Sequence, residues 1–252
     1  AVISVFLGVF VSLSAISIGK GLQIAIKDKL YSLSPDLVIS TYENNSRGIA
    51  SEKINNFESI NNEIKNTLKG IEIEKTIEKP TLISVDNSFE TVIFRGVNNG
   101  YNFRDFNKFI IGSKIKNDIT NNEIIISKSL SDNLKILVGQ NLTLYFQVNN
   151  NQRIPNVRSF KVSHIYETDF PDFDNNYIIG NLETLQNVYK WSKNDFGNIE
   201  ISVEDKLQIS LIEKSISLLK SFEKNNLSTK TVQSKYANIF SWISIFDFNI
   251  LI

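Results

Sequence analysis

Few side chains in this sequence could carry catalytic or metal chemistry. His164 is the only histidine among 252 residues, and the chain has no cysteine. A multi-histidine metal site and thiol catalysis are therefore excluded. His164 stands in the strand-like segment FKVSHIYET, where a histidine more commonly packs or forms a hydrogen bond than acts as a catalyst. We therefore expect a structural role for it.

Three carboxylates, those of Asp169, Asp172 and Asp174, come nearest to a metal-binding pattern. Their segment lacks the turn glycine and the terminal bidentate glutamate of a calcium-binding EF-hand loop, so it is predicted to be a solvated loop. The sequence also lacks a nucleophile elbow and the phosphate-binding pattern GxxxxGK[ST]. We expect no metal site and no catalysis in this chain.

Residues 148–159, VNNNQRIPNVRS, have side chains suited to docking. Strand-like segments flank this polar stretch, which predicts the tip of a β-hairpin. Arg153 and Arg158 offer forked donors to carboxylates, while Ile154 and Pro155 form a stiff apolar knob. A docking site and an ordinary exposed loop are both compatible with this pattern.

Charge narrows the choice of partners. The chain carries 27 basic and 27 acidic residues, so it lacks the basic excess that binding to nucleic-acid phosphates requires. Nucleic acid is therefore excluded as an expected partner.

The N-terminal stretch, residues 1–19, contains no charged residue and is rich in Val, Ile, Leu and Phe. About 20 such residues in a helix cross a membrane, so residues 1–33 are predicted to be the end of a transmembrane helix and its stalk. A secretory signal and a buried helix of a soluble protein are the alternatives. Apolar residues recur with helical spacing as far as Leu33, and Ser34-Pro35 should end the helix. The aromatic and apolar tail, residues 237–252, is predicted to begin a second transmembrane helix.

The region between these helices is predicted to be an α+β domain in three segments. Residues 34–96 read as a strand, a helix and then two alternating strands, IEIEKTIEKPTLISV and FETVIFRGV, paired around the turn VDNSF. Residues 97–176 read as a strand-rich insertion, and residues 177–236 as mixed again. Ser127, Asn181 and Asp205 are predicted N-caps. The last of these should begin one helix through residue 222, with Leu207, Leu211, Ile212, Ile216 and Leu219 on one face.

Several strings resemble permease subunits of bacterial ABC transporters, both the lipoprotein-releasing LolC and LolE and the MacB-like efflux permeases. The strings, in chain order, are GLQIAIKDKLYSLSPDLVIS, VIFRGV, NEIIISKSLSDNLKILVGQNLTLYF, FKVSHIYETDFPDFDNNYIIGNLETLQNVYKW, NIEISVED and YANIFSWISIFDFN. Their order and spacing together are specific, and the last two strings resemble the lipoprotein-releasing branch more than the efflux branch. The sequence departs from related ones in carrying His164 and Asp169 where glycine is usual.

This resemblance implies a periplasmic domain with a porter-like part, residues 34–96 and 177–236, and an inserted sabre-like part, residues 97–176. It implies a non-catalytic permease in the bacterial inner membrane, with residues 34–236 in the periplasm. A separate ATPase subunit would bind ATP and Mg²⁺. The permease would pair with a second copy or with a sister permease.

The resemblance further implies that lipoproteins pass from the membrane lipid to a periplasmic carrier. The hairpin with Arg153, Ile154, Pro155 and Arg158 would hook that carrier. One face of the first helix would line the path of the lipid anchor, with the candidates Val9, Leu13, Ile16 and Leu22. The alternatives are MacB-like efflux and FtsX-like regulation of a periplasmic hydrolase.

Overall fold

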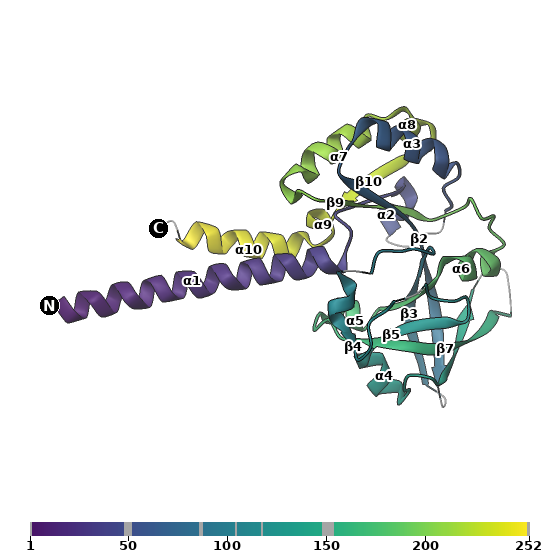
Figure 1. The fold of residues 1–252 in the computed structure, drawn as a ribbon, viewed down its shortest axis with the longest axis horizontal. Coiled ribbons are helices and arrows are strands. Elements are labelled where there is room, and N and C mark those ends of the chain that lie inside the picture. Colours follow the sequence, from purple (N-terminus) through teal and green to yellow (C-terminus); the bar gives the residue numbers. More distant parts are fainter. Residues whose placement is uncertain are drawn as a thin grey trace.

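A long helical stalk projects from a two-lobed domain in the computed structural model, which describes residues 2–47, 52–85, 88–103, 105–116, 118–147 and 154–250. Helix α1 (Val2–Leu33) runs without a break, as predicted. Helix α10 (Ala237–Ile250) lies beside its domain-proximal half, so both ends of the chain leave the same side of the domain (Figure 1). The bend at Ser34-Pro35 ends α1, because the residue before a proline disfavours helical geometry.

One mixed sheet runs through both lobes. Its strand order is β10 (Leu227–Thr231), β1 (Leu37–Thr41), β9 (Asn198–Val203), β2 (Ile71–Val85), β3 (Ser88–Val97), β8 (Tyr177–Asn181), β5 (Glu123–Ser127), β7 (Asn156–Tyr166) and β4 (Ile110–Ile111), while β6 (Asn141–Phe146) pairs with β2 and β7. Strand β2 crosses between the lobes, because its first half pairs with β9 and its second half with β3 and β6. The predicted antiparallel pair of β2 and β3 is confirmed.

Short helices surround the sheet. The first lobe contains β10, β1 and β9 with α2 (Tyr42–Arg47), α3 (Phe57–Thr67), α7 (Ile209–Ser217) and α8 (Lys220–Lys224). The second lobe contains the remaining strands with α4 (Lys128–Leu134), α5 (Pro171–Asp174), α6 (Leu182–Tyr189) and the 3₁₀ turn η1 (Phe106–Phe109). The turn η2 (Lys206–Gln208) precedes α7, and α9 (Val232–Lys235) leads into α10.

All three predicted N-caps are confirmed. The side chain of Ser127 accepts from the amide of Leu130 at 3.1 Å, and that of Asn181 accepts from the amide of Glu183 at 2.8 Å. The carboxylate of Asp205 likewise accepts from the following turn. These side chains satisfy amides that have no partner inside the helix, which is why the helices begin there.

The single helix predicted after Asp205 is wrong, because the segment divides into η2, α7 and α8. The carboxylate of Glu63 in α3 accepts from the amides of Lys220 and Ser221 at 2.9 and 3.2 Å. This contact caps α8 from a distant helix and starts a new helix axis. Leu207, in η2, is 93% exposed and Leu211 is 71% exposed, although both were predicted to share a face with the buried Ile216.

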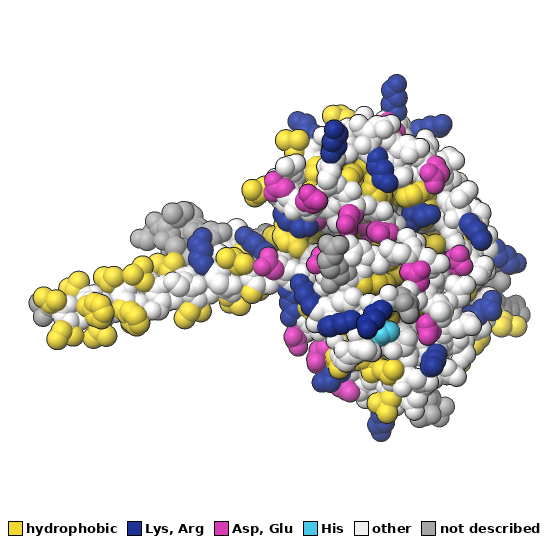
Figure 2. Space-filling view, viewed as in Figure 1, with side chains coloured by type: hydrophobic (Ala, Val, Ile, Leu, Met, Phe, Trp, Pro, Cys, Tyr) yellow, Lys and Arg dark blue, Asp and Glu magenta, His cyan; other side chains and the backbone are white. Residues whose placement is uncertain are grey.

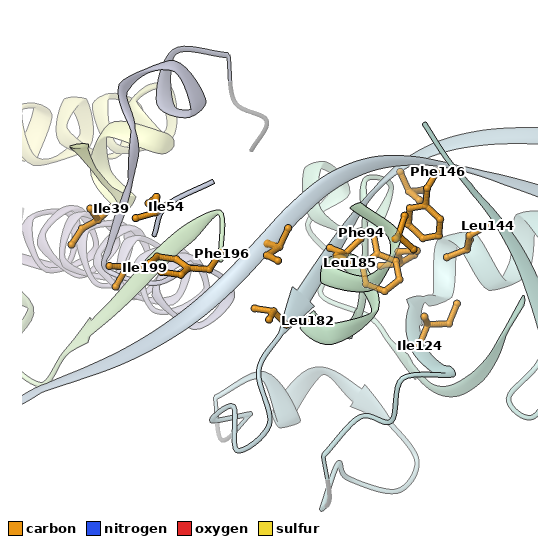
Figure 3. Close-up of a cluster of buried hydrophobic side chains, with 14 of the residues drawn as sticks. Ile39, Ile54, Phe94, Ile124, Leu144, Phe146, Leu182, Leu185, Phe196 and Ile199 are labelled. Carbon is orange, nitrogen blue, oxygen red and sulfur yellow. The ribbon is translucent and has the colours of Figure 1, made fainter. Parts of the chain in front are cut away.

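The core of the second lobe is built around the aromatic ring of Phe94. Its centroid lies 5.7 Å from those of both Phe146 and Phe160, and Figure 3 shows this cluster beside Leu144 and Leu185. A Cβ added to Gly180 would lie 2.2 Å from the Phe94 ring, so β8 can pass there only with glycine. A second cluster of aromatic side chains packs under α5 and η1.

The predicted boundaries at residues 96 and 176 stay a prediction. Strand β8, assigned from the sequence to the second porter-like segment, lies between β3 and β5 of the second lobe. The mixed α and β composition of the domain agrees with the expected class.

Candidate functional site

The stalk junction is the place where α1, α10 and the sheet meet. The hydroxyls of Ser34 and Tyr236 lie 3.0 Å apart, and the rings of Tyr31 and Phe240 are in edge contact at 6.2 Å. Farther along the stalk, the amide of Gln23 donates to the Ile243 carbonyl at 3.3 Å. Because only Pro35 and Asp36 separate Ser34 from β1, a displacement of the stalk acts directly on the sheet.

An apolar groove of about 560 Å³ lies at this junction. Its walls are Ile26, Leu30, Phe170, Ile239 and Trp242, with Lys29, Asp169 and Asn238 beside them. The ammonium of Lys29 and the carboxylate of Asp169 form an ion pair at 3.6 Å. Asp169 has a φ of 52°, the left-handed region that favours glycine, which agrees with the glycine usual here in related sequences.

The four lipid-path candidates are all exposed on α1. At about 100° per residue, Val9, Leu13 and Ile16 share one face of the helix, whereas Leu22 lies about 150° away from that face. The structure therefore brings three of the four together. On the face that Figure 2 shows, hydrophobic side chains cover the outer end of the stalk and charged ones lie toward the domain. Among the described residues, α1 is the one helix long and apolar enough to cross a membrane.

The predicted hairpin is formed by β6 and β7, paired from Asn141 with Lys161 to Phe146 with Asn156. Ile154 is 79% exposed and Pro155 is also exposed, while Arg153 lies outside the described residues. Arg158 was predicted on the tip, but it stands opposite Leu144 within the ladder. The tip is shorter than predicted because the strand pairing begins at Asn156.

A polar cavity of about 260 Å³ beside the hairpin contains Arg158, and the sequence did not indicate it. Its other lining residues come from β7, α6 and the loop before β5, and they are Asn121, Asn122, Ser159, Phe160, Thr184 and Asn187. The three asparagines of this cavity have no regular spacing in the sequence, so no local pattern predicts that they lie together. The hydroxyl of Tyr189 at the end of α6 also reaches the carbonyl of Gln147, at 3.4 Å, and so contacts the root of the hairpin.

A buried ionic network joins the two lobes across β2. The guanidinium of Arg95 in β3 donates to the carboxylate of Glu200 in β9 at 2.7 Å, and both side chains are about 95% buried. The hydroxyls of Thr76 and Tyr101 donate to the same carboxylate at 2.9 and 3.2 Å. Burial, with Glu200 nearby, raises the pKa of the Glu74 carboxyl. The sequence analysis did not predict this network. Its only local signal was one charged residue within each of two apolar strings, Arg95 in VIFRGV and Glu200 in NIEISV.

The residues first considered for chemistry do not assemble a reactive site. The ring of His164 lies 3.1 Å from the Ser163 hydroxyl, and partial burial lowers its pKa. Asp174 is buried rather than solvated, because it accepts from the hydroxyl of Thr168 at 2.7 Å and from its amide. The prediction of a solvated loop is therefore wrong for Asp174. No group of three possible metal ligands occurs in the described part of the chain.

Comparison with known proteins places this geometry in a family. The MacB-like periplasmic core domain family matches residues 1–219. The periplasmic region of MacB from Actinobacillus actinomycetemcomitans has a similar fold, with a TM-score of 0.53, 16% identity, and coverage of 81% of this chain and 91% of that one. A search of curated proteins returned no match.

A second similar structure is the extracellular domain of the noncanonic ABC-type transporter YknZ from Gram-positive bacteria. Its TM-score is 0.50 at 16% identity, over 77% of this chain and 99% of that one. These likenesses concern the fold, while the family match covers most of the chain. The family supports the role of a membrane-bound transporter permease with an ATPase partner. The chain belongs to the MacB-like periplasmic core domain family of ABC transporter permeases.

Proposed function

We propose that this chain belongs to an inner-membrane permease that releases lipoproteins to a periplasmic carrier. The observation that carries the proposal is the stalk junction, where α1 and α10 pack together and α1 leads straight into the sheet. ATP-driven movement of the membrane helices would reach the hairpin through this junction and strand β2. In this proposal the permease itself is non-catalytic, and a separate ATPase subunit binds ATP and Mg²⁺.

The apolar groove supports a lipid substrate. Its walls come from both stalk helices, and it lies next to the segment predicted to cross the membrane. Burying an acyl chain there removes apolar surface from water at about 25 cal/mol per Å². At about 100° per residue, Leu22 lies on the same side of α1 as Ile26 and Leu30 of the groove and would continue this path toward the membrane, while Val9, Leu13 and Ile16 form a second candidate face.

The carrier experiment uses the protein in detergent micelles and a periplasmic lipoprotein carrier as bait. We expect Arg153→Glu with Arg158→Glu to reduce carrier capture at least about tenfold, because charge reversal places carboxylates opposite carboxylates. Lys214→Glu with Lys224→Glu, in α7 and α8, is the matched control, since it makes the same change of charge in the other lobe. Capture by the double variant at the control level would reject the docking role of the hairpin.

The lipid-path experiment places photocrosslinking residues at Val9, Leu13, Ile16 and Trp242, with Leu22 as a probe of a different face. Leu211 on α7 is the control, because it is 71% exposed and apolar but belongs to the domain surface. We expect a labelled lipoprotein to crosslink to the Val9 face and the groove. Equal crosslinking at Leu211 would contradict a defined path.

MacB-like efflux is the second candidate function, because the fold resembles the periplasmic region of MacB. In that case a periplasmic adaptor, rather than a lipoprotein carrier, would bind the domain. Parallel capture assays with a carrier and an adaptor separate the two proposals.

A further inference from the structure

A small polar cavity of about 100 Å³ lies on the face of the sheet that the helices α3, α7 and α8 leave uncovered. We call it the interlobe cavity, because its walls come from strands of both lobes and from the two ends of the stalk junction. Its lining residues are Ser34, Pro35, Val38, Ser40, Asn44, Asn45, Glu78, Arg95, Tyr177, Asn198, Glu200, Lys230, Thr231, Val232 and Lys235. This cavity is separate from the apolar groove and from the hairpin.

The register of the sheet explains why polar side chains gather here. Residues directly opposite each other in neighbouring strands share a face, and Asn198 stands opposite both Ser40 in β1 and Thr76 in β2. Glu78 stands opposite Arg95 in the same way. The other face of these strands is apolar and packs into the core.

Three side chains in this cavity, those of Asn198, Glu78 and Lys230, form no hydrogen bond or ion pair with any described residue. Asn198 is 92% buried, yet its carboxamide forms no hydrogen bond in the described part of the chain. The half-buried side chains of Glu78 and Lys230 form no ion pair with any described residue. Lys235 is exposed in α9; its ammonium stands 5.7 and 5.4 Å from the ring centroids of Tyr177 and Tyr236, and the nearby Glu78 carboxylate attracts it. Polar groups this close to the interior are normally paired, because leaving them unpaired costs about 1–3 kcal/mol each.

The charges that line the cavity indicate which ligand would fit it. Arg95 and Glu200 neutralise each other, and the remaining groups are the ammonium groups of Lys230 and Lys235, the carboxylate of Glu78, which attracts Lys235 without an ion-pair contact, and the carboxamide of Asn198. An anion alone would be repelled by Glu78, and a cation alone by the two lysines. A molecule with an acid group at one end and an ammonium at the other satisfies both ends.

We propose that the interlobe cavity binds a small zwitterion with an ammonium and an acid group a few bonds apart, such as an amino acid or a phosphoethanolamine group. The acid group lies toward Lys230 and Lys235, the ammonium lies toward Glu78, and Asn198 forms a hydrogen bond to the ligand. Because the walls come from both lobes and from α9, which leads into α10, the bound molecule stiffens the connection between the lobes and the stalk.

The test is isothermal titration of the protein in detergent micelles with glycine, O-phosphoethanolamine and glycerophosphoethanolamine. Acetate and ethylammonium are the singly charged controls. We expect at least one zwitterion to bind, with affinity falling at least about tenfold in Glu78→Gln and in Lys235→Met. Preference for glycine indicates a free amino acid, and preference for glycerophosphoethanolamine indicates a lipid headgroup.

The matched control variants are Glu72→Gln and Lys75→Met on the same strand. Glu72 lines a different cavity, and Lys75 points to the opposite side of β2, over the ring of Phe57. Binding should be unchanged in both. The proposal is overturned if no zwitterion binds up to about 10 mM, if acetate or ethylammonium binds equally well, or if all four variants weaken binding alike.

Discussion

Lys79 is a buried cation whose contribution to stability can be measured directly. It lies in β2, is 5% exposed, and its ammonium stands 4.7 Å from the ring centroid of Tyr189 and 4.6 Å from that of Trp191. No carboxylate of the described residues forms an ion pair with it. Burial lowers the pKa of Lys79 from 10.5 to about 8.

The sign of the pH effect follows from this lowered pKa. Between pH about 8 and 10.5 the unfolded chain holds the Lys79 proton while the folded protein has released it, so the free energy of unfolding rises with pH in that window. Below pH 8 both states are charged, and the cost of burying the cation is constant. The lowering of the Lys79 pKa from 10.5 to about 8 corresponds to a destabilisation of the folded state by about 3 kcal/mol when the lysine is charged in both states. The two rings favour the charged form and reduce this cost to about 1–3 kcal/mol.

The perturbation is Lys79→Met, which keeps the length of the side chain and removes its charge. We expect the variant to be about 1–3 kcal/mol more stable than the wild type at pH 7, and the difference to vanish near pH 10.5. Urea unfolding followed by circular dichroism from pH 6 to about 10.5 measures both quantities. The control is Lys75→Met, which removes the contact of a half-buried lysine with the ring of Phe57 and should lower stability by about 0.5–1 kcal/mol.

Two results would refute this reasoning. A Lys79→Met variant less stable than the wild type at pH 7 would mean that the two rings more than offset the cost of burial. A stability difference that stays the same across the pH range would mean that the proton of Lys79 is not linked to folding.

Three further outcomes are expected from substitutions in the folded domain. Arg95→Met should destabilise the protein by about 3–5 kcal/mol in urea unfolding, because it leaves the Glu200 carboxylate buried without its partner, and adding Glu200→Leu should restore most of the loss. Gly180→Ala should cost at least about 1–3 kcal/mol in the same assay, since its Cβ would overlap the buried ring of Phe94. Asp174→Asn should cost about 1–3 kcal/mol, and Ca²⁺ should leave the melting temperature of the wild type unchanged, because this carboxylate is occupied by hydrogen bonds within the chain.

Several elements could be predicted because the signal is contained in neighbouring residues. The uncharged run before Lys20 and the Ser34-Pro35 pair predicted the stalk and its end. The alternating strings predicted the antiparallel pair of β2 and β3, and the capping side chains predicted the starts of α4 and α6. Caps and alternation act over two to four residues, so they can be read without the fold.

The candidate site was predicted in part. The hairpin of β6 and β7 was expected, but its exact register placed Arg158 in the strand instead of on the tip. A polar stretch predicts a turn, whereas the point at which pairing begins depends on which residues face the core. The lipid-path residues were also predicted in part. Leu22 was grouped with Val9 by its apolar character, although helical geometry separates the two.

The sequence by itself determined the stalk, most of the strands and the membership of a transporter family, because these depend on local periodicity and on the order of short motifs. Only the tertiary structure decided that Glu63 interrupts the helix after Ile216, that Arg95 pairs with Glu200, and that unpaired polar groups surround the interlobe cavity. Arg95 and Glu200 are 105 positions apart in the sequence, and Glu63 and Lys220 are 157 positions apart. Contacts over such separations form only when the whole chain closes on itself, so no local pattern records them.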